Sequence, residues 1–350
     1  MSDSVKTAEV IQAWLVSRLS ETLGIEPQAI DVREPFVSYG LGSTEAVSLA
    51  GELAEWLDRK LSPALVYEYS TIEALASHLA GSSDVPGPMR GADRGPVSDH
   101  EPITVIGIGC RFPGANDPRA FWDLLRNGVD AISEVPADRF DQWAFYDADP
   151  SVPGKMNTRW GGFLDQVDRF YANFFGIAPR EALRMDPQQR LLLEVTWEAL
   201  QDAGQAPERL AGSQVGVFIG ISTGDYGRRQ WNDLAGIDAY SGTGNAPSIA
   251  ANRISYLFDF RAPSIAIDTA CSSSLVAIHL ACRSLRSGES ALAVAGGVNL
   301  ILSPAIAINF TKAGAMAPDG RCKAFDASAN GYVRSEGAGV VVLKPLSRAV

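Results

Sequence analysis

One cysteine lies in a segment whose residue types suit nucleophilic chemistry. The segment SIAIDTACSSSLVAIHLACRSLRSG, residues 264–288, opens with an apolar run that ends at Asp268. A helix is predicted to start around Cys271 and to close at Gly288. A thiol at a helix N-terminus meets the positive end of the helix dipole, which favours the nucleophilic thiolate. Because the serines behind it are small and leave room for a substrate, Cys271 is the candidate nucleophile.

The other cysteines and the nearest histidine are weaker candidates. Cys110, Cys282 and Cys322 are interpreted as inert buried thiols, the usual state of an unpaired cysteine. A protease-like pairing of Cys271 with His279 fails on distance, because eight helical residues separate the two by roughly 12 Å. His279 lies in an apolar run, where a structural role is expected.

Two glycine patterns resemble other catalytic motifs. The stretch GISTG at residues 220–224 follows an apolar run and fits the nucleophile elbow of serine hydrolases. That chemistry needs a histidine base, and the three histidines, at positions 78, 100 and 279, are badly placed for it. The stretch GIG at residues 107–109 lacks the third glycine of a dinucleotide-binding fingerprint, where Phe112 stands instead. We therefore set both functions aside.

A serine near the N-terminus offers a second kind of chemistry. In YGLGSTEAVSLAGELAEWL, Ser43 follows two glycines and begins a predicted helix. One interpretation is a helix N-cap, for which serine is a preferred residue. The other is a serine displayed for modification, since a phosphodiester there would face free N–H groups and the positive end of the helix. The residues alone leave both interpretations open and favour the cap.

The first predicted domain, residues 1–80, is an all-α four-helix bundle. Apolar spacing predicts helices over residues 7–23, 43–60 and 71–79, with a short apolar patch at 61–69. The first helix ends at Gly24, and the last begins at Ser70 with Glu73 as its capping-box partner. Residues 81–102 contain four glycines and four prolines, which is typical of a flexible linker.

The second predicted domain, residues 103–350, alternates strands with helices. Strands are expected at residues 103–109, 215–219, 264–267, 291–295 and 340–343. Helices are expected at residues 118–127 and from Asp186 to Gly204. This order predicts an α/β layered fold with a mostly parallel sheet. The helix after Cys271, which carries Leu275 and Ile278, is expected to be buried on most sides.

Charge and composition exclude several functions. The net charge is −11, of which −8 falls within residues 1–85 and −3 in the rest. Such an acidic chain is a poor partner for nucleic acid or an anionic membrane surface. No apolar stretch is long enough to span a bilayer, and no secretory signal is visible. Four cysteines without a pairing pattern favour a reducing, cytoplasmic compartment.

The segment around Ser43, together with the later LVYEYSTIEALASHL, resembles acyl and peptidyl carrier proteins. In that family a phosphopantetheinyl transferase attaches 4′-phosphopantetheine to the serine, and the thiol of this group holds the acyl chain. The resemblance, over residues 7–80, implies Ser43 as the attachment site. The family usually has Asp-Ser-Leu, whereas this chain has Gly42-Ser43-Thr44 and lacks the neighbouring acid. The acidic second helix suits docking on basic partner surfaces.

The motifs DTACSSSLVAIHLA, VIGIGCRFPG, MDPQQRLLLEVTWEAL and PDGRCKAFDASANGYVRSEGAGVVVLKPL resemble the β-ketoacyl synthase domain of modular (type I) polyketide synthases. The resemblance implies a thiolase-like fold of two similar halves, here the first half only, and a homodimer. It implies that Cys271 accepts an acyl chain as a thioester. A malonyl-type extender then loses CO₂ and attacks this thioester, while backbone N–H groups, including that of Cys271, hold the oxyanion.

The same family uses two histidines and a lysine from the second half of the fold. They would lie beyond residue 350, which is 79 residues after Cys271. We therefore expect a fragment of a longer synthase with downstream synthase domains. A leading carrier resembles a loading position, served by an upstream acyl-activating enzyme such as a fatty acyl-AMP ligase. Two alternatives stay open: a truncated product that acts only as an acyl carrier, and a half-domain completed by another chain.

Overall fold

The protein consists of two compact units, Met1–Ala92 and Asp93–Val350, each with its own hydrophobic core. The computed structural model describes residues 6–39, 41, 43–59, 61, 65–69, 71–80 and 101–349. The predicted linker, residues 81–102, lies outside the described residues except for its last two. Within the described ranges, no helix is both long and apolar enough to cross a bilayer.

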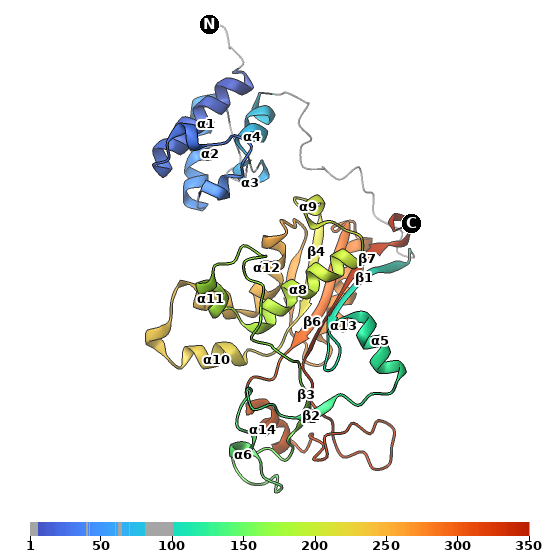
Figure 1. The fold of residues 1–350 in the computed structure, drawn as a ribbon. Helices are drawn as coiled ribbons and strands as arrows, with labels where there is room; N and C mark the ends of the chain where they lie inside the picture. Colours follow the sequence, from blue (N-terminus) through green and yellow to red (C-terminus); the bar gives the residue numbers. More distant parts are fainter. Residues whose placement is uncertain are drawn as a thin grey trace. The chain divides into compact units, whose positions relative to one another are not determined.

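The first unit is a bundle of four helices, drawn in blue in Figure 1. These are α1 (Ala8–Leu23), α2 (Ser43–Leu57), α3 (Leu65–Glu68) and α4 (Ile72–Leu79). Two 3₁₀ turns, Pro27–Ala29 and Phe36–Tyr39, lie between α1 and α2. The apolar faces meet in a core whose most deeply buried side chains are Ile11, Leu15, Leu19, Leu53, Ile72 and Leu75. The predicted all-α bundle is confirmed.

Two helix ends of this unit were predicted: the end of α1 is confirmed, and the start of α4 is not. Gly24 ends α1 with φ +66°, and its N–H donates to the Ser20 carbonyl at 2.9 Å. The predicted cap of α4 at Ser70 is wrong by one residue, and Ser70 itself lies outside the described residues. Thr71 is the N-cap, because it pairs with Pro35 in extended conformation and its Oγ1 accepts the Ala74 N–H at 3.2 Å.

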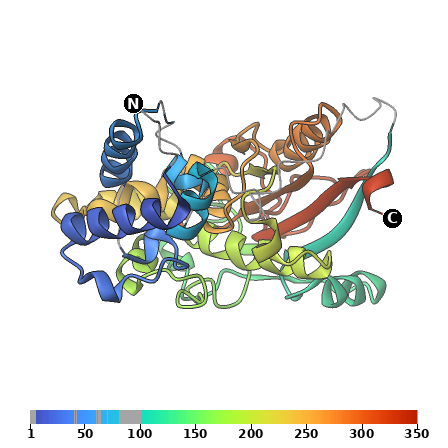
Figure 2. The ribbon, with the colours of Figure 1, turned by 90° about the horizontal axis from the view of Figure 1, so that it is seen from above.

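The second unit is built on a five-stranded sheet with strand order β1-β7-β6-β4-β5. The strands are β1 (Ile103–Arg111), β4 (Val215–Gly220), β5 (Ser264–Ile267), β6 (Leu292–Asn299) and β7 (Gly337–Pro345). Strand β4 is parallel to β5 and β6, whereas β7 is antiparallel to β6 and β1, and β1 lies beside β7 in both ribbon views (Figures 1 and 2). Four strands thus share one direction, as predicted, but half of the pairings are antiparallel.

Helices cover the two faces of this sheet. Helices α8 (Pro187–Asp202) and α12 (Pro247–Leu257) pack on one face, against alternate residues such as Val217 and Ile219. Helix α13 (Ser273–Arg286) packs on the other face, against Phe218, Ala293 and Ala295. The alternation follows from the two-residue period of a strand. The predicted α/β layered fold is confirmed.

Shorter elements surround the layers. They are α5 (Pro118–Arg126), α6 (Gln142–Phe145), α7 (Pro179–Arg184), α9 (Pro207–Leu210), α10 (Asp225–Trp231), α11 (Ala239–Asn245), α14 (Ala305–Lys312) and the 3₁₀ turns Leu234–Gly236 and Leu346–Arg348. Strands β2 (Ile132–Glu134) and β3 (Trp160–Gly162) form a separate two-stranded antiparallel sheet.

The expectation that the helix after Cys271 is buried on most sides is wrong. Helix α13 buries one face, through Ala277, Ala281 and Leu285. On its other face Leu275 is 71% exposed and His279 is exposed. Apolar residues in the sequence of this helix therefore do not show on how many sides it is packed.

The glycines of the GIG stretch, residues 107–109, have a packing role. They lie inside β1, where α8 crosses the strand. A Cβ at Gly107 would lie 2.4 Å from the Ala199 carbonyl oxygen, and one at Gly109 would lie 2.2 Å from that of Val195. These contacts are too short for any side chain, so both glycines let the helix approach the sheet.

Candidate active site

Cys271 lies on the turn that joins β5 to α13. Helix α13 begins at Ser273 with Ser272 as its N-cap, so the predicted helix start at Cys271 is two residues too early. The turn is tight: Ala270 adopts φ +55°, a left-handed conformation that non-glycine residues seldom take. Thr269 and Cys271 form a bridge across it. The Cys271 side chain is exposed at this corner.

Short polar side chains hold the turn in this conformation. The Asp268 Oδ1 accepts the Ala270 N–H at 3.0 Å. The Ser273 Oγ accepts the Thr269 N–H at 2.9 Å and donates to the Ala270 carbonyl at 2.6 Å. The serines of the segment therefore fix the backbone around the thiol, in addition to leaving space beside it.

Two glycines allow the start of α13 to sit directly on the sheet. A Cβ on Gly220, the last residue of β4, would lie 2.7 Å from the Ser274 nitrogen. A Cβ on Gly297, in β6, would lie 2.9 Å from the Ser274 Cβ. The position of Cys271 thus depends on glycine at these two positions in β4 and β6. The GISTG stretch that fits a nucleophile elbow contributes this close contact through its first glycine.

Cys271 opens into a cavity of about 690 Å³. Its wall is formed by separate stretches of the chain that include Phe112, Gly220–Thr223, Cys271, Asn299, Phe310 and 332–339. Among the described residues, no histidine contributes to this lining. His78 stacks on Tyr69 in the first unit, with ring centroids 4.1 Å apart, and His100 lies outside the described residues. The serine-hydrolase interpretation therefore still lacks the histidine base that it requires.

A chain of buried polar groups ties the cavity wall to α8. Asp186 caps that helix by accepting the Gln188 N–H at 2.9 Å. The Gln188 amide donates to the Thr223 carbonyl at 3.0 Å and accepts from the Thr223 hydroxyl at 3.0 Å. Asn299, beside Thr223, donates to the Ser335 carbonyl at 2.8 Å. Counted from the cavity wall, Asp186 is the last member of this hydrogen-bonded series, and burial raises its pKa.

A buried ion pair anchors Glu336, the residue directly before β7. Both Glu336 oxygens accept bonds from Arg139, at 3.1 Å each. The same carboxylate accepts the Leu164 N–H at 2.8 Å and the Ile301 N–H at 2.9 Å. Glu336 thereby joins three separate segments of the chain, and its charge is matched by Arg139.

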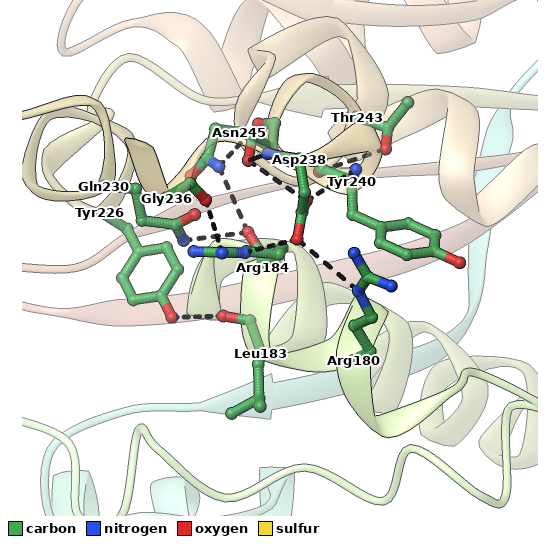
Figure 3. A network of polar contacts seen from close by, with 11 residues as sticks. Arg180, Leu183, Arg184, Tyr226, Gln230, Gly236, Asp238, Tyr240, Thr243 and Asn245 are labelled. Atoms are coloured by element: carbon green, nitrogen blue, oxygen red, sulfur yellow. Dashed lines mark hydrogen bonds and ion pairs between the residues drawn. The ribbon is translucent and has the colours of Figure 1, made fainter. Parts of the chain in front are cut away.

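A second polar network connects α7, α10 and α11 (Figure 3). The Arg184 guanidinium donates to the Asp238 carboxylate at 3.0 Å and to the Gly236 carbonyl at 2.6 Å. Gln230 and Asn245 donate to the Arg184 carbonyl. Desolvation opposes ionisation of Asp238, but its bonds from Arg184 and the Tyr240 N–H outweigh this and lower its pKa. The network fixes the segment that leads into α8.

The remaining predicted site residues fall as follows. Ser43 is the first residue of α2, and its side chain lies outside what the structure describes. Cys110 is buried, as predicted, whereas Cys282 is only half-buried. The prediction is wrong for Cys322, which is exposed and whose Sγ accepts the Val333 N–H at 3.3 Å. In the described part of the chain, no three or more metal-ligating side chains gather.

Sequence reasoning missed Thr223, Asn299, Glu336 and Arg334 as residues of the cavity. In the sequence, residues 332–336 stand out only as part of a family motif, with no role for each residue. A buried charge pair whose members lie 197 residues apart, as Arg139 and Glu336 do, leaves no local signal. The one available hint is the presence of charged residues directly before the apolar run of β7.

Comparison with protein families gives two matches. Residues 13–79 match the phosphopantetheine attachment site family. Residues 100–349 match the β-ketoacyl synthase family, N-terminal domain. The second match contains the whole cavity described above.

The chain is similar to large proteins of mycobacterial polyketide synthesis. It is 48% identical over 353 residues to one subunit of the phenolphthiocerol/phthiocerol polyketide synthase of Mycobacterium tuberculosis strain H37Rv, a match that covers 100% of this chain and 19% of that protein. It is 57% identical over 256 residues to another subunit of the same synthase, covering 73% of this chain and 14% of that protein. The chain therefore spans about a fifth or less of these relatives.

Solved ketosynthases share the fold. The oxazolomycin ketosynthase domain of Streptomyces albus JA3453 is 44% identical with a TM-score of 0.68, over 71% of this chain and 43% of that one. The ketosynthase from module 6 of the bacillaene synthase of Bacillus subtilis 168 is 40% identical with a TM-score of 0.63, over 71% and 40%. Both likenesses cover less than half of the solved ketosynthase chains.

Proposed function

Because the chain belongs to the β-ketoacyl synthase family and joins that domain to a phosphopantetheine carrier domain, as polyketide synthases do, we propose that it extends acyl chains by decarboxylative condensation. In this proposal the carrier domain comprises residues 1–80, the linker residues 81–102 and the synthase portion residues 103–350. Cys271 is the catalytic residue, and Ser43 carries the 4′-phosphopantetheine.

The exposed position of Cys271 at the cavity wall is the observation that carries the proposal. The thiol stands at a strained corner, in front of the N-terminus of α13, beside a cavity of about 690 Å³. A catalytic thiol needs access, a fixed backbone and room for an acyl group. Apolar residues in the lining, including Phe112, Val298, Ile306 and Phe310, suit an acyl chain.

The proposed reaction has two steps. First, the Cys271 thiolate attacks an acyl thioester, forms a new thioester and releases the carrier thiolate. Second, a malonyl-type extender loses CO₂; the electron pair of the broken C–C bond stays on its α-carbon and attacks the acyl carbonyl, which expels the Cys271 thiolate. Backbone N–H groups, that of Cys271 among them, stabilise the tetrahedral oxyanion of each attack. The product is a β-ketoacyl thioester.

Ser43 suits the attachment of phosphopantetheine because it begins α2, a helix of fifteen residues. The free N–H groups and the positive end of this helix stabilise a phosphodiester at its first residue. The partner enzyme for this step is a phosphopantetheinyl transferase.

The full reaction belongs to a longer protein in this proposal. The solved ketosynthases are more than twice as long as the part that this chain matches. By family resemblance, that remainder supplies the two histidines and the lysine of condensation, and the domain works as a homodimer. Further synthase domains and an acyl-activating enzyme would be its partners.

Acyl loading tests the two site assignments separately. We expect a labelled acyl thioester to acylate the purified chain, and expect Cys271→Ala to abolish loading of the synthase unit. Cys322→Ala, which removes another exposed thiol, is the matched control and should leave loading intact. Ser43→Ala should abolish only phosphopantetheine attachment. Loading that survives Cys271→Ala, with label found on the carrier alone, would support a pure carrier and reject the synthase role.

A further inference from the structure

Arg334 is a buried cation with an unused donor in the wall of the Cys271 cavity. The residue is only 7% exposed and lies just ahead of β7, in the same short stretch as Glu336. Its Nη1 is buried and has no hydrogen-bond partner within the described ranges. Several other buried polar atoms also lack a partner, but among the described residues Arg334 alone of that group lines this cavity.

The carboxylates around Arg334 are already engaged elsewhere. Asp225 and Glu336 lie within electrostatic range of the guanidinium. However, Glu336 is held by Arg139 and by two backbone N–H groups. Asp225 accepts the Leu302 N–H at 3.2 Å and pairs with Arg228 at 3.3 Å. Arg334 therefore has no carboxylate of its own among its described neighbours.

An unpaired buried cation is costly, since burial removes its hydration without providing a counter-charge. Desolvation lowers the pKa of Arg334, against the opposing fields of Tyr332, Asp225 and Glu336. The phenol of Tyr332, in the same wall, is in electrostatic range of both Arg334 and Cys271. An anionic ligand group in the cavity would remove this cost and would lie close to the nucleophile.

We propose that Arg334 binds the carboxylate of the malonyl-type extender. This inference rests on the proposed function. Of the two substrates in that reaction, only the extender bears a free carboxylate. Arg334 would therefore distinguish the extender from the acyl substrate that loads Cys271. A planar guanidinium suits a carboxylate because it can donate two parallel bonds.

The assignment concerns binding and not the loss of CO₂. A cation paired with the carboxylate stabilises the bound extender, and decarboxylation then moves the electron pair to the α-carbon and away from Arg334. Arg334 is thus a specificity residue whose removal raises the KM for the extender more than it changes kcat. A charge-assisted hydrogen bond of the usual strength corresponds to roughly a 10- to 100-fold change in affinity.

Binding of two inert analogues tests the proposal in the full-length synthase subunit. The probes are a malonyl pantetheine analogue with CH₂ in place of the thioester sulfur, and its malonamyl counterpart, in which a neutral amide replaces the carboxylate. Calorimetry on the unmodified protein should give at least roughly tenfold tighter binding of the carboxylate probe. Arg334→Gln should reduce this preference below about twofold, and Arg334→Lys should retain part of it.

Arg159→Gln is the matched control. This arginine pairs with Glu134 at 3.4 Å and lies over the Trp143 ring, outside the cavity lining. Equal affinity of the unmodified protein for the two probes would overturn the proposal, whatever the folding of the variants. So would a carboxylate preference that survives Arg334→Gln, or equal weakening of both probes. Absence of acyl loading on Cys271 would instead reject the proposed function, because analogue binding needs no acylation.

Discussion

Arg139 and Glu336 form a fully buried ion pair, with side chains 2% and 0% exposed and two bonds of 3.1 Å between them. The pair joins a loop near β2 to the residue that directly precedes β7, and Glu336 lines the cavity together with Arg334 and Ser335. Its geometry leaves neither Glu336 oxygen unsatisfied.

Removing one member of this pair should therefore cost more than removing both. We expect Glu336→Gln to lower the free energy of unfolding by about 3–5 kcal/mol, because Arg139 would lose its buried counter-charge and keep only the exposed Asp138 carboxylate, 2.9 Å from its Nη1. The double variant Arg139→Met, Glu336→Leu should recover part of that loss. Urea unfolding of the 350-residue chain measures both values. A loss below about 1 kcal/mol in the single variant would show that water reaches this site.

Gly220→Ala should displace Cys271, the proposed nucleophile. The added Cβ would lie 2.7 Å from the Ser274 nitrogen, so the start of α13 must move away from the sheet. We expect a loss of about 1–3 kcal/mol of stability from overpacking, and at least roughly a tenfold fall in the rate of Cys271 acylation. Gly224→Ala, with no atom within 4 Å of the new Cβ, is the control and should leave the acylation rate unchanged. Equal rates in both variants would contradict the argument.

Glu194 should make the protein less stable as the pH rises. Burial raises the pKa of Glu194 above its ordinary 4.5, against the opposing effects of its bond from the Tyr171 N–H and of Arg111. The folded state thus holds this proton after the unfolded state has released it, so folding loses stability as the pH rises above about 4.5. Glu194→Gln keeps an acceptor for Tyr171 and removes the titration.

The stability of Glu194→Gln relative to the unmodified protein should accordingly increase between about pH 4 and pH 7. Denaturant unfolding at several pH values measures this difference. Glu198→Gln, one turn along α8 but salt-bridged to Arg111, serves as the comparison, since its carboxylate has a direct cationic partner. A difference that stays flat with pH for Glu194→Gln would mean that the side chain is well solvated.

The four thiols should react in an order set by exposure. Cys271 and Cys322 are exposed and should be alkylated in the native protein. Burial raises the pKa of Cys110 and of half-buried Cys282, which keeps both in the unreactive thiol form. Iodoacetamide labelling followed by peptide mass spectrometry measures the four rates. Native labelling of Cys110 as fast as that of Cys322 would contradict the core packing around β1.

Much of the fold is predictable because its signals are local. The strand Ser264–Ile267 and helix α8 are where an apolar run and an Asp-Pro start indicate them. Boundaries fail where tertiary contacts decide them: Thr71 replaces Ser70 as a cap because it pairs with Pro35, and α13 starts late because residues 268–272 form a turn. The exposed face of α13 could not be predicted, since apolar composition does not report how many layers cover a helix.

The residues of the candidate site also differ in whether the sequence alone can predict them. Cys271 is predictable from its own segment, because the residues around it are contiguous. Arg334, Asn299 and Thr223 are not, since their common cavity exists only after β4, β6 and β7 align side by side. Glycines such as Gly107 mislead for the same reason: the neighbour that requires them, α8, is distant in the sequence.

The order in which the cavity wall is synthesised has a consequence for the newly made protein. In sequence order, Phe112 is the first residue of the cavity wall and Gly339 the last, and Cys271 comes between them. The ribosome therefore adds roughly 70 residues after Cys271 before the last wall residue exists, several seconds at about 5–20 residues per second. Throughout that interval the Cys271 thiol is present without the complete cavity wall. Under the proposed function, selective acylation of Cys271 can therefore begin only after β7 has been translated.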